Sequence, residues 1–208
     1  MSLNYSLHEM GIMKKDNKNF LYHGSSVQGI NTLNPISKLH NSDNKVVYLT
    51  SNVPYALVYI WDSIKTGTNQ KWVTCGLKRG IVYYEEQFPN QLKELYEGVS
   101  GYLYVVPKDS TVQTVENREE MYFSTNPIAV RQTIYVPDVY QALCKCQQEG
   151  TFQLLKFTDA TPEKQQQLID MISDYLYQSG VLNEHNSDSY FFQKYFKESW
   201  KKAESKNA

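Results

Sequence analysis

The chain has 208 residues, enough for one ordinary domain with a normal core, so neither a disulfide nor a metal is needed to hold it together. Its 21 Lys and Arg against 22 Asp and Glu give a formal charge of −1, which argues against nucleic-acid binding driven by bulk charge. An odd count of 3 Cys and a polar N-terminus predict a cytoplasmic protein. The longest apolar run, near Pro54–Trp61, is too short to span a membrane.

Residues 1–19 show no hydrophobic period and are rich in Asn, Lys and Ser, which predicts a flexible leader. The run Phe20–His23 predicts a short strand, ended by a turn at Gly24–Ser26. Residues 29–35 have the composition of a loop or a short helical turn, and residues 40–45 that of a polar loop. The β-branched and aromatic run Val46–Thr50, bounded by turn formers, predicts a second strand.

A capping side chain and Pro54 predict a helix over Val53–Thr66, stopped by Gly67. The centre of the chain then alternates short apolar runs with turn residues. It predicts strands at Trp72–Leu77, Gly80–Tyr84, Gly101–Val106, Met121–Ser124 and Thr133–Val136, with helices at Gln87–Glu97 and from Pro137 to Gln148.

The remainder predicts a helical hairpin. Apolar positions at helical spacing follow Thr161-Pro162 and end at Gly180, and a second helix with an aromatic face covers Asp188–Lys202. We therefore expect an α+β protein in three parts: the leader 1–19, a domain over 20–150 and a C-terminal helical extension over 151–208.

Three segments stand out together, because two of them carry residues suited to binding a planar aromatic ligand and the third carries acidic residues. His23 ends a strand and precedes Gly24, whose small size lets a planar ligand approach the backbone. Tyr48 lies on the second strand and Tyr59 on the following helix, so their rings can form two walls around an aromatic ring. The third segment places Glu119 and Glu120 at the start of a strand.

With these motifs in this order, the sequence resembles the ADP-ribosyltransferase superfamily, in its diphtheria-toxin-like or poly(ADP-ribose) polymerase branch. The resemblance covers about residues 20–140. It implies a split sheet of mixed and antiparallel strands, with His23 and Gly24 as the His-Gly motif, Tyr48 as the strand tyrosine and Tyr59 as the tyrosine that stacks on nicotinamide. NAD would be the substrate, with no metal, and the acceptor is left open.

The acid of the implied His-Tyr-Glu set is Glu120, with Glu119 as the adjacent alternative. A second alignment puts Gln132 at this position, which removes the carboxylate. In the first alignment, Glu120 would stabilise the positive charge that develops on ribose as nicotinamide leaves.

Two functions follow from these alternatives. The first is an NAD-dependent ADP-ribosyltransferase or NAD glycohydrolase. The second is a binding module of the same fold with a decayed site, which holds a nucleotide, a nucleic acid or a protein partner. The position of the carboxylate relative to His23 and Tyr48 separates them.

Overall fold

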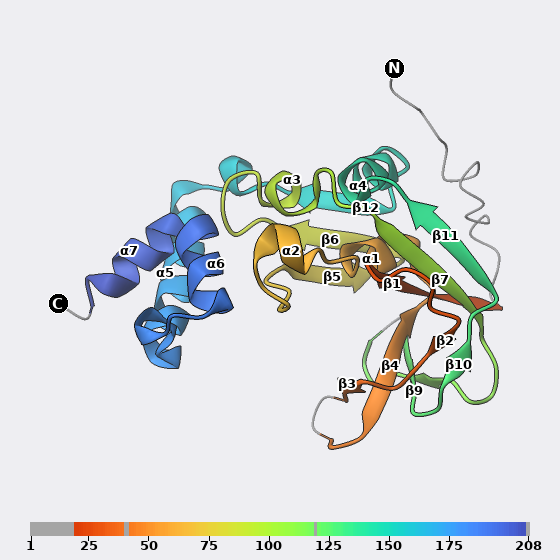
Figure 1. The fold of residues 1–208 in the computed structure, drawn as a ribbon. Helices are drawn as coiled ribbons and strands as arrows, with labels where there is room; N and C mark the ends of the chain where they lie inside the picture. The colour runs from red at the N-terminus through yellow and green to blue at the C-terminus, as the bar shows by residue number, and fades with distance from the viewer. Residues whose placement is uncertain (1–18, 40–41, 119, 207–208) are drawn as a thin grey trace.

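The structure is a computed structural model that describes residues 19–39, 42–118 and 120–206. Of the expected leader, residues 1–18 lie outside the described residues. The described chain combines helices with antiparallel and mixed sheets, which confirms the expected α+β class (Figure 1).

The largest sheet is antiparallel, with strand order β11-β7-β1-β4-β9-β8 and β3 paired to β4. Its strands are β1 (Phe20–Ser25), β3 (Ser37–Lys38), β4 (Lys45–Thr50), β7 (Gly101–Pro107), β8 (Gln113–Thr114), β9 (Met121–Ser124) and β11 (Gln132–Val136). The turn expected from Gly24 is wrong, because β7 pairs with β1 as far as Ser25 and keeps the chain extended.

Two smaller sheets complete the strand pairing. One joins β2 (Thr32–Leu33) to β10 (Ile128–Ala129), and the other has the order β12-β6-β5, from β5 (Thr74–Lys78), β6 (Ile81–Glu85) and β12 (Phe152–Leu155). Residues 29–35, expected to form a loop or a short helical turn, contain β2, a strand too short to show a period in sequence. β12 lies after residue 150, where the central domain was expected to end, and it pairs in parallel with β6 of that domain.

β1 and β4 meet over a much shorter stretch than β1 and β7. All six residues of β1 pair with β7, from Phe20 opposite Pro107 to Ser25 opposite Tyr102. Against β4 the register has one pair, Tyr22 with Thr50. β4 and β9 turn away from β1 and β7 in Figure 1, so the sheet opens between β1 and β4 beyond this pair.

The single helix expected over 53–66 is wrong, because the chain forms two helices there: α1 (Val53–Val58) and α2 (Ser63–Thr66). α1 begins at Asn52, whose side chain accepts from the Tyr55 amide. It ends where the Tyr59 amide donates back to Ala56. Asp62 then caps α2 through the amides of Ile64 and Lys65, and Gly67 ends it as expected.

The other helices are α3 (Gln91–Tyr96), α4 (Val139–Gln148), α5 (Pro162–Ser179), α6 (Ser187–Tyr195) and α7 (Lys197–Glu204), with 3-10 turns η1 (Phe157–Asp159) and η2 (Val181–Asn183). The expected tail helix over 188–202 is divided at Phe196, which has φ −103° and ψ 49°. Its ring is 2% exposed and packs on Phe88 and Phe192, so tertiary packing overrides continuation of the helix.

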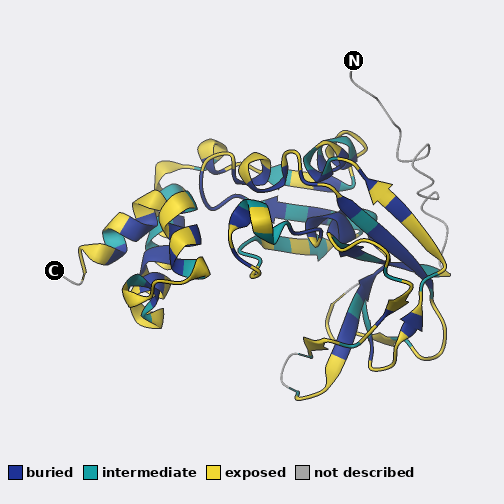
Figure 2. Cartoon of the chain, in the orientation of Figure 1, coloured by how far each residue is buried: buried dark blue, intermediate teal, exposed yellow. Residues whose placement is uncertain are grey.

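Buried side chains form two clusters that involve opposite faces of the largest sheet (Figure 2). Neighbouring residues of β1 show the alternation, because Leu21 belongs to the smaller cluster and Tyr22 to the larger. The larger cluster includes buried residues of α1, α3, α4 and the C-terminal helices. Helix α1 therefore covers one face of the sheet, directly over β1.

Gly24 lets α1 approach β1 at backbone distance. A Cβ atom at this position would lie 1.9 Å from the carbonyl oxygen of Ala56 and 3.2 Å from a side-chain carbon of Ile60. Gly101 on β7 has the same relation to Ile60, since a Cβ there would lie 2.3 Å from its Cγ2. Both glycines thus leave the space in which the second half of α1 and Ile60 rest.

Replacing Gly24 by alanine should destabilise the fold by about 2–3 kcal/mol, because the added methyl group meets backbone that can move only with the whole helix. Chemical denaturation measures the change in the free energy of unfolding. Gly76→Ala on β5 is the matched control, since its Cβ would meet no atom within 4 Å. Equal stability of the two variants would contradict this account of the α1 contact.

Candidate functional site

His23 bridges the opening between β1 and β4 with its side chain. Its Nδ1 lies 3.0 Å from the backbone oxygen of Tyr48. A carbonyl oxygen only accepts, so Nδ1 carries the proton and donates it. The neutral ring then keeps Nε2 as a hydrogen-bond acceptor for another group.

Tyr48 and Tyr59 are close enough to interact electrostatically. Tyr59 is 37% exposed at the C-terminal end of α1, and burial of its hydroxyl is the main cause of its raised pKa, to which Tyr48 adds a small contribution. Tyr55, one turn earlier on α1, has its hydroxyl 3.3 Å from that of Tyr59. The Tyr48 hydroxyl donates to the backbone oxygen of Lys38. The structure therefore brings His23, Tyr48 and Tyr59 into one neighbourhood.

Sequence reasoning missed three residues of this neighbourhood. The Lys71 ammonium lies 3.5 Å from the ring centroid of Tyr59, and its charge adds to the burial that lowers the pKa of His23. Cys75 on β5 has a thiol pKa raised by burial, and the charges of Lys71 and Arg118 oppose this rise. We call this set the imidazole–tyrosine cluster: His23, Tyr48, Tyr55, Tyr59, Lys71, Cys75 and Arg118.

Glu120 is held at the other end of α1. It precedes β9 with a left-handed φ of 57°, and its Oε2 accepts from the Asn52 side-chain amide at 3.0 Å. Its backbone oxygen accepts from the Ser51 amide and the Thr50 hydroxyl. Asn52 caps the start of α1 and Tyr59 caps its end, which separates the two along the helix axis by roughly 10 Å at 1.5 Å per residue.

The other expected site residues have different placements. Glu119 lies outside the described residues. Gln132 pairs with Val105 of β7, and β7 lies on the side of β1 opposite β4, so Gln132 is remote from Tyr48 in strand order. The Cα of Gly24 faces α1, as described above. The contact of the Gly24 backbone with a planar ligand stays a prediction.

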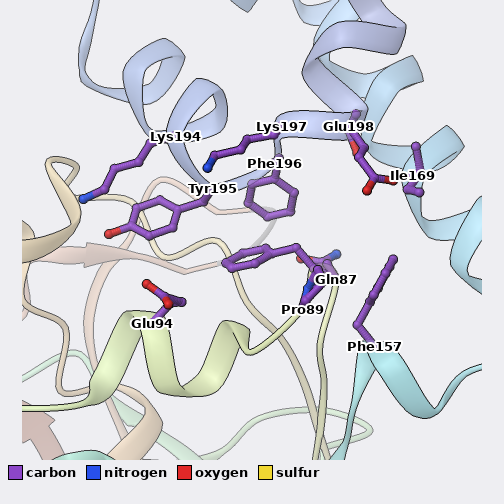
Figure 3. Close-up of a pocket in the computed structure, with 12 residues that line it drawn as sticks. Gln87, Pro89, Glu94, Phe157, Ile169, Lys194, Tyr195, Phe196, Lys197 and Glu198 are labelled. Carbon is purple, nitrogen blue, oxygen red and sulfur yellow. The ribbon is translucent and has the colours of Figure 1, made fainter.

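A separate pocket of about 410 Å³ opens where the C-terminal helices meet the loop before α3 (Figure 3). Phe88, Phe157 and Phe196 form its apolar wall, and Lys194 and Lys197 lie on the side of α6 and α7. The imidazole–tyrosine cluster contributes none of its lining residues. The pocket is therefore distinct from the site that the sequence predicts.

Within residues 19–39, 42–118 and 120–206, no group of three or more His, Cys, Asp and Glu side chains is arranged to hold a metal ion. Among the described helices, none combines the length and apolar character needed to cross a membrane. Comparison with protein-family models, curated proteins and solved structures finds no match. A function can therefore be inferred only from the arrangement of the side chains themselves.

The burial of His23 predicts a pH-dependent loss of stability. Burial lowers the pKa of its imidazole, and Lys71 adds to this, while the bond to Tyr48 opposes it. Because the unfolded imidazole has a pKa near 6.5, the unfolded chain binds the proton first, and stability falls as the pH drops below that value. The free energy of unfolding, measured in urea at pH 7.5 and 5.5, should decrease more in the wild type than in His23→Gln.

His185→Gln, at an exposed position, is the matched control and should keep the wild-type loss on acidification. The same loss in His23→Gln as in the wild type would contradict the assignment of a partly buried, neutral imidazole to His23.

Proposed function

We propose that the imidazole–tyrosine cluster binds the nicotinamide end of NAD, and that the chain transfers the ADP-ribosyl group of NAD to an acceptor or to water. The observation that supports this most is the contact of His23 with Tyr48 across the opening between β1 and β4, beside the exposed ring of Tyr59. This opening agrees with the split sheet that the family resemblance implies.

The groups have properties that suit the parts of NAD. Nε2 of His23 can accept from a ribose hydroxyl, because Nδ1 is engaged by Tyr48. The ring face of Tyr59 already attracts the Lys71 ammonium, and the nicotinamide ring of NAD carries a positive charge of the same kind. A cationic aromatic ring can therefore gain both stacking and cation–π attraction at Tyr59.

In the proposed reaction, the bond between ribose C1′ and the nicotinamide nitrogen breaks, and nicotinamide leaves with the electron pair. The positive charge left on the ribose is stabilised by the carboxylate of Glu120, with Glu119 as the alternative acid. The acceptor hydroxyl or water then bonds to C1′ and gives its proton to a carboxylate or to solvent.

A second candidate function is nucleotide binding without turnover. The position of Glu120 favours it, because its carboxylate is bonded to Asn52 at the start of α1, away from Tyr59 at the end. In this alternative, Glu120 is a structural residue that joins the start of β9 to the cap of α1.

Nicotinamide release from NAD by the purified chain tests the proposal. Glu120→Gln keeps the shape and a hydrogen-bonding oxygen for Asn52 but removes the charge, so release should fall about 100-fold while the melting temperature changes little. Glu119→Ala tests the alternative acid. Glu116→Ala, an exposed acid earlier in the same loop, is the control and should retain wild-type release.

Calorimetric titration with NAD separates the two candidates. Binding together with release that depends on Glu120 or Glu119 supports the transferase. Binding that His23→Ala and Tyr59→Ala weaken, without release above the acid variants, supports the binding module. If the wild type neither binds NAD nor releases nicotinamide, with or without lysate as a source of acceptors, the proposal is wrong.

A further inference from the structure

The pocket beside the C-terminal helices has a wall of buried aromatic rings. The centroids of the Phe88 and Phe196 rings lie 4.9 Å apart in an edge-to-face arrangement, and Phe88 stacks on Tyr195 at 5.8 Å with 29° between the ring planes. These contacts hold the rings of the wall against one another. At about 410 Å³ the pocket also lies in the size range of small-molecule sites, which is roughly 300–1,000 Å³.

The division of the tail helix at Phe196 brings the parts of this pocket together. Its lining residues 194–199 run across the end of α6 and the start of α7. Gln87 and Phe88 come from the loop before α3, and Phe157 comes from η1. Three segments that are distant in sequence therefore build one cavity around the break between α6 and α7.

Two neutral polar side chains are buried in this lining without a partner in the described parts of the chain. Gln87 is 8% exposed, and although its backbone amide donates to the Gln91 side chain, its own carboxamide bonds to no described residue. Ser199 is 3% exposed, and its hydroxyl likewise forms no hydrogen bond there. In Figure 3 the Gln87 side chain lies inside the pocket, between Phe157 and Phe196. Buried polar side chains are nearly always paired within the protein, so these two groups indicate a ligand.

The exposed rim of the pocket carries charges of both signs. Lys194 and Lys197 come from α6 and the start of α7, and Glu94 and Glu198 come from α3 and α7 (Figure 3). Because the lining has two cations and two anions, the rim has no excess of charge with which to select a charged ligand. The neutral groups inside the pocket therefore determine which ligand fits.

We propose that this pocket binds a planar, uncharged heteroaromatic ring of the purine type, with its polar edge on Gln87 and Ser199. A carboxamide presents a donor and an acceptor side by side, which match the amino group of adenine and the ring nitrogen beside it. The Ser199 hydroxyl can donate to a further ring nitrogen. The rings of the wall supply the apolar surface against which the ligand packs.

The site is separate from the imidazole–tyrosine cluster, which contributes none of its lining residues. The proposal uses neither Glu120 nor a bond of NAD, so it does not rest on the proposed function. Absence of nicotinamide release would overturn the transferase and leave the pocket standing.

Calorimetric titration of the full chain with adenine at pH 7.5, where this base is uncharged, provides the test. Purine lacks the amino group and leaves the acceptor of Gln87 without a partner, so it should bind at least tenfold more weakly than adenine. Indole has a similar shape without the paired donor and acceptor, and should also bind more weakly. AMP distinguishes the sources of the ring: tighter binding than adenine assigns the pocket to a nucleotide, and equal binding assigns it to the base alone.

Gln87→Leu keeps most of the side-chain volume but removes the donor and the acceptor, so adenine binding should fall at least tenfold. The melting temperature should change little, because the carboxamide has no protein partner to lose. Ser199→Ala should weaken adenine binding about threefold at the same melting temperature. Both variants should bind indole as the wild type does. Gln153→Leu, at an exposed position of β12 outside the pocket, is the control and should bind adenine normally.

Nuclear Overhauser contacts between the adenine protons and the methyl groups of Ile169, which lines the pocket, should locate the ligand. Contacts to the Tyr59 ring without contacts to Ile169 would place adenine at the imidazole–tyrosine cluster and overturn the proposal. No adenine binding by the wild type up to the limit of its solubility would overturn it as well. So would unchanged adenine binding in Gln87→Leu, or indole bound as tightly as adenine.

Discussion

The close contact of α1 with β1 at Gly24 is the constraint on which the site depends. Because Gly24 has no side chain, the backbone carbonyl of Ala56 occupies the space that a side chain at this position of β1 would fill. The helix is then fixed over the opening between β1 and β4, with Asn52 and Glu120 at its start and Tyr59 at its end. Because α1 has six residues, its position on Gly24 sets both ends at once.

Trp72 joins the C-terminal helices to the segment that carries Lys71. Its ring packs on Phe192 of α6 at 4.7 Å and on Tyr175 of α5 at 5.4 Å between ring centroids. The preceding residue, Lys71, directs its ammonium to Tyr59. The neighbouring side chains of Lys71 and Trp72 thus join the helical tail to the imidazole–tyrosine cluster, which gives the aromatic face of α6 a structural role.

The sequence predicts those strands and helices whose signals come from neighbouring residues. The run Val46–Thr50 and the caps of α5, Thr161 and Gly180, specify a strand and a helix without distant partners, and both are present. The break at Phe196 and the place of Lys71 depend on contacts with residues far along the chain. Likewise, local motifs predicted His23, Tyr48 and Tyr59 as members of one site. No local sequence signal indicates that the Asn52 side chain binds the carboxylate of Glu120.

The formal charge of −1 does not describe how charge is distributed around α1. The carboxylate of Glu120 accepts a hydrogen bond from Asn52 at the start of the helix, while the ammonium of Lys71 lies on the Tyr59 ring at its end. Opposite charges therefore lie at the two ends of α1 in a chain that is almost neutral overall. A partly buried ammonium interacts over short distances with little screening, so Lys71 would act on a bound ligand as a local charge, whatever the net charge of the molecule.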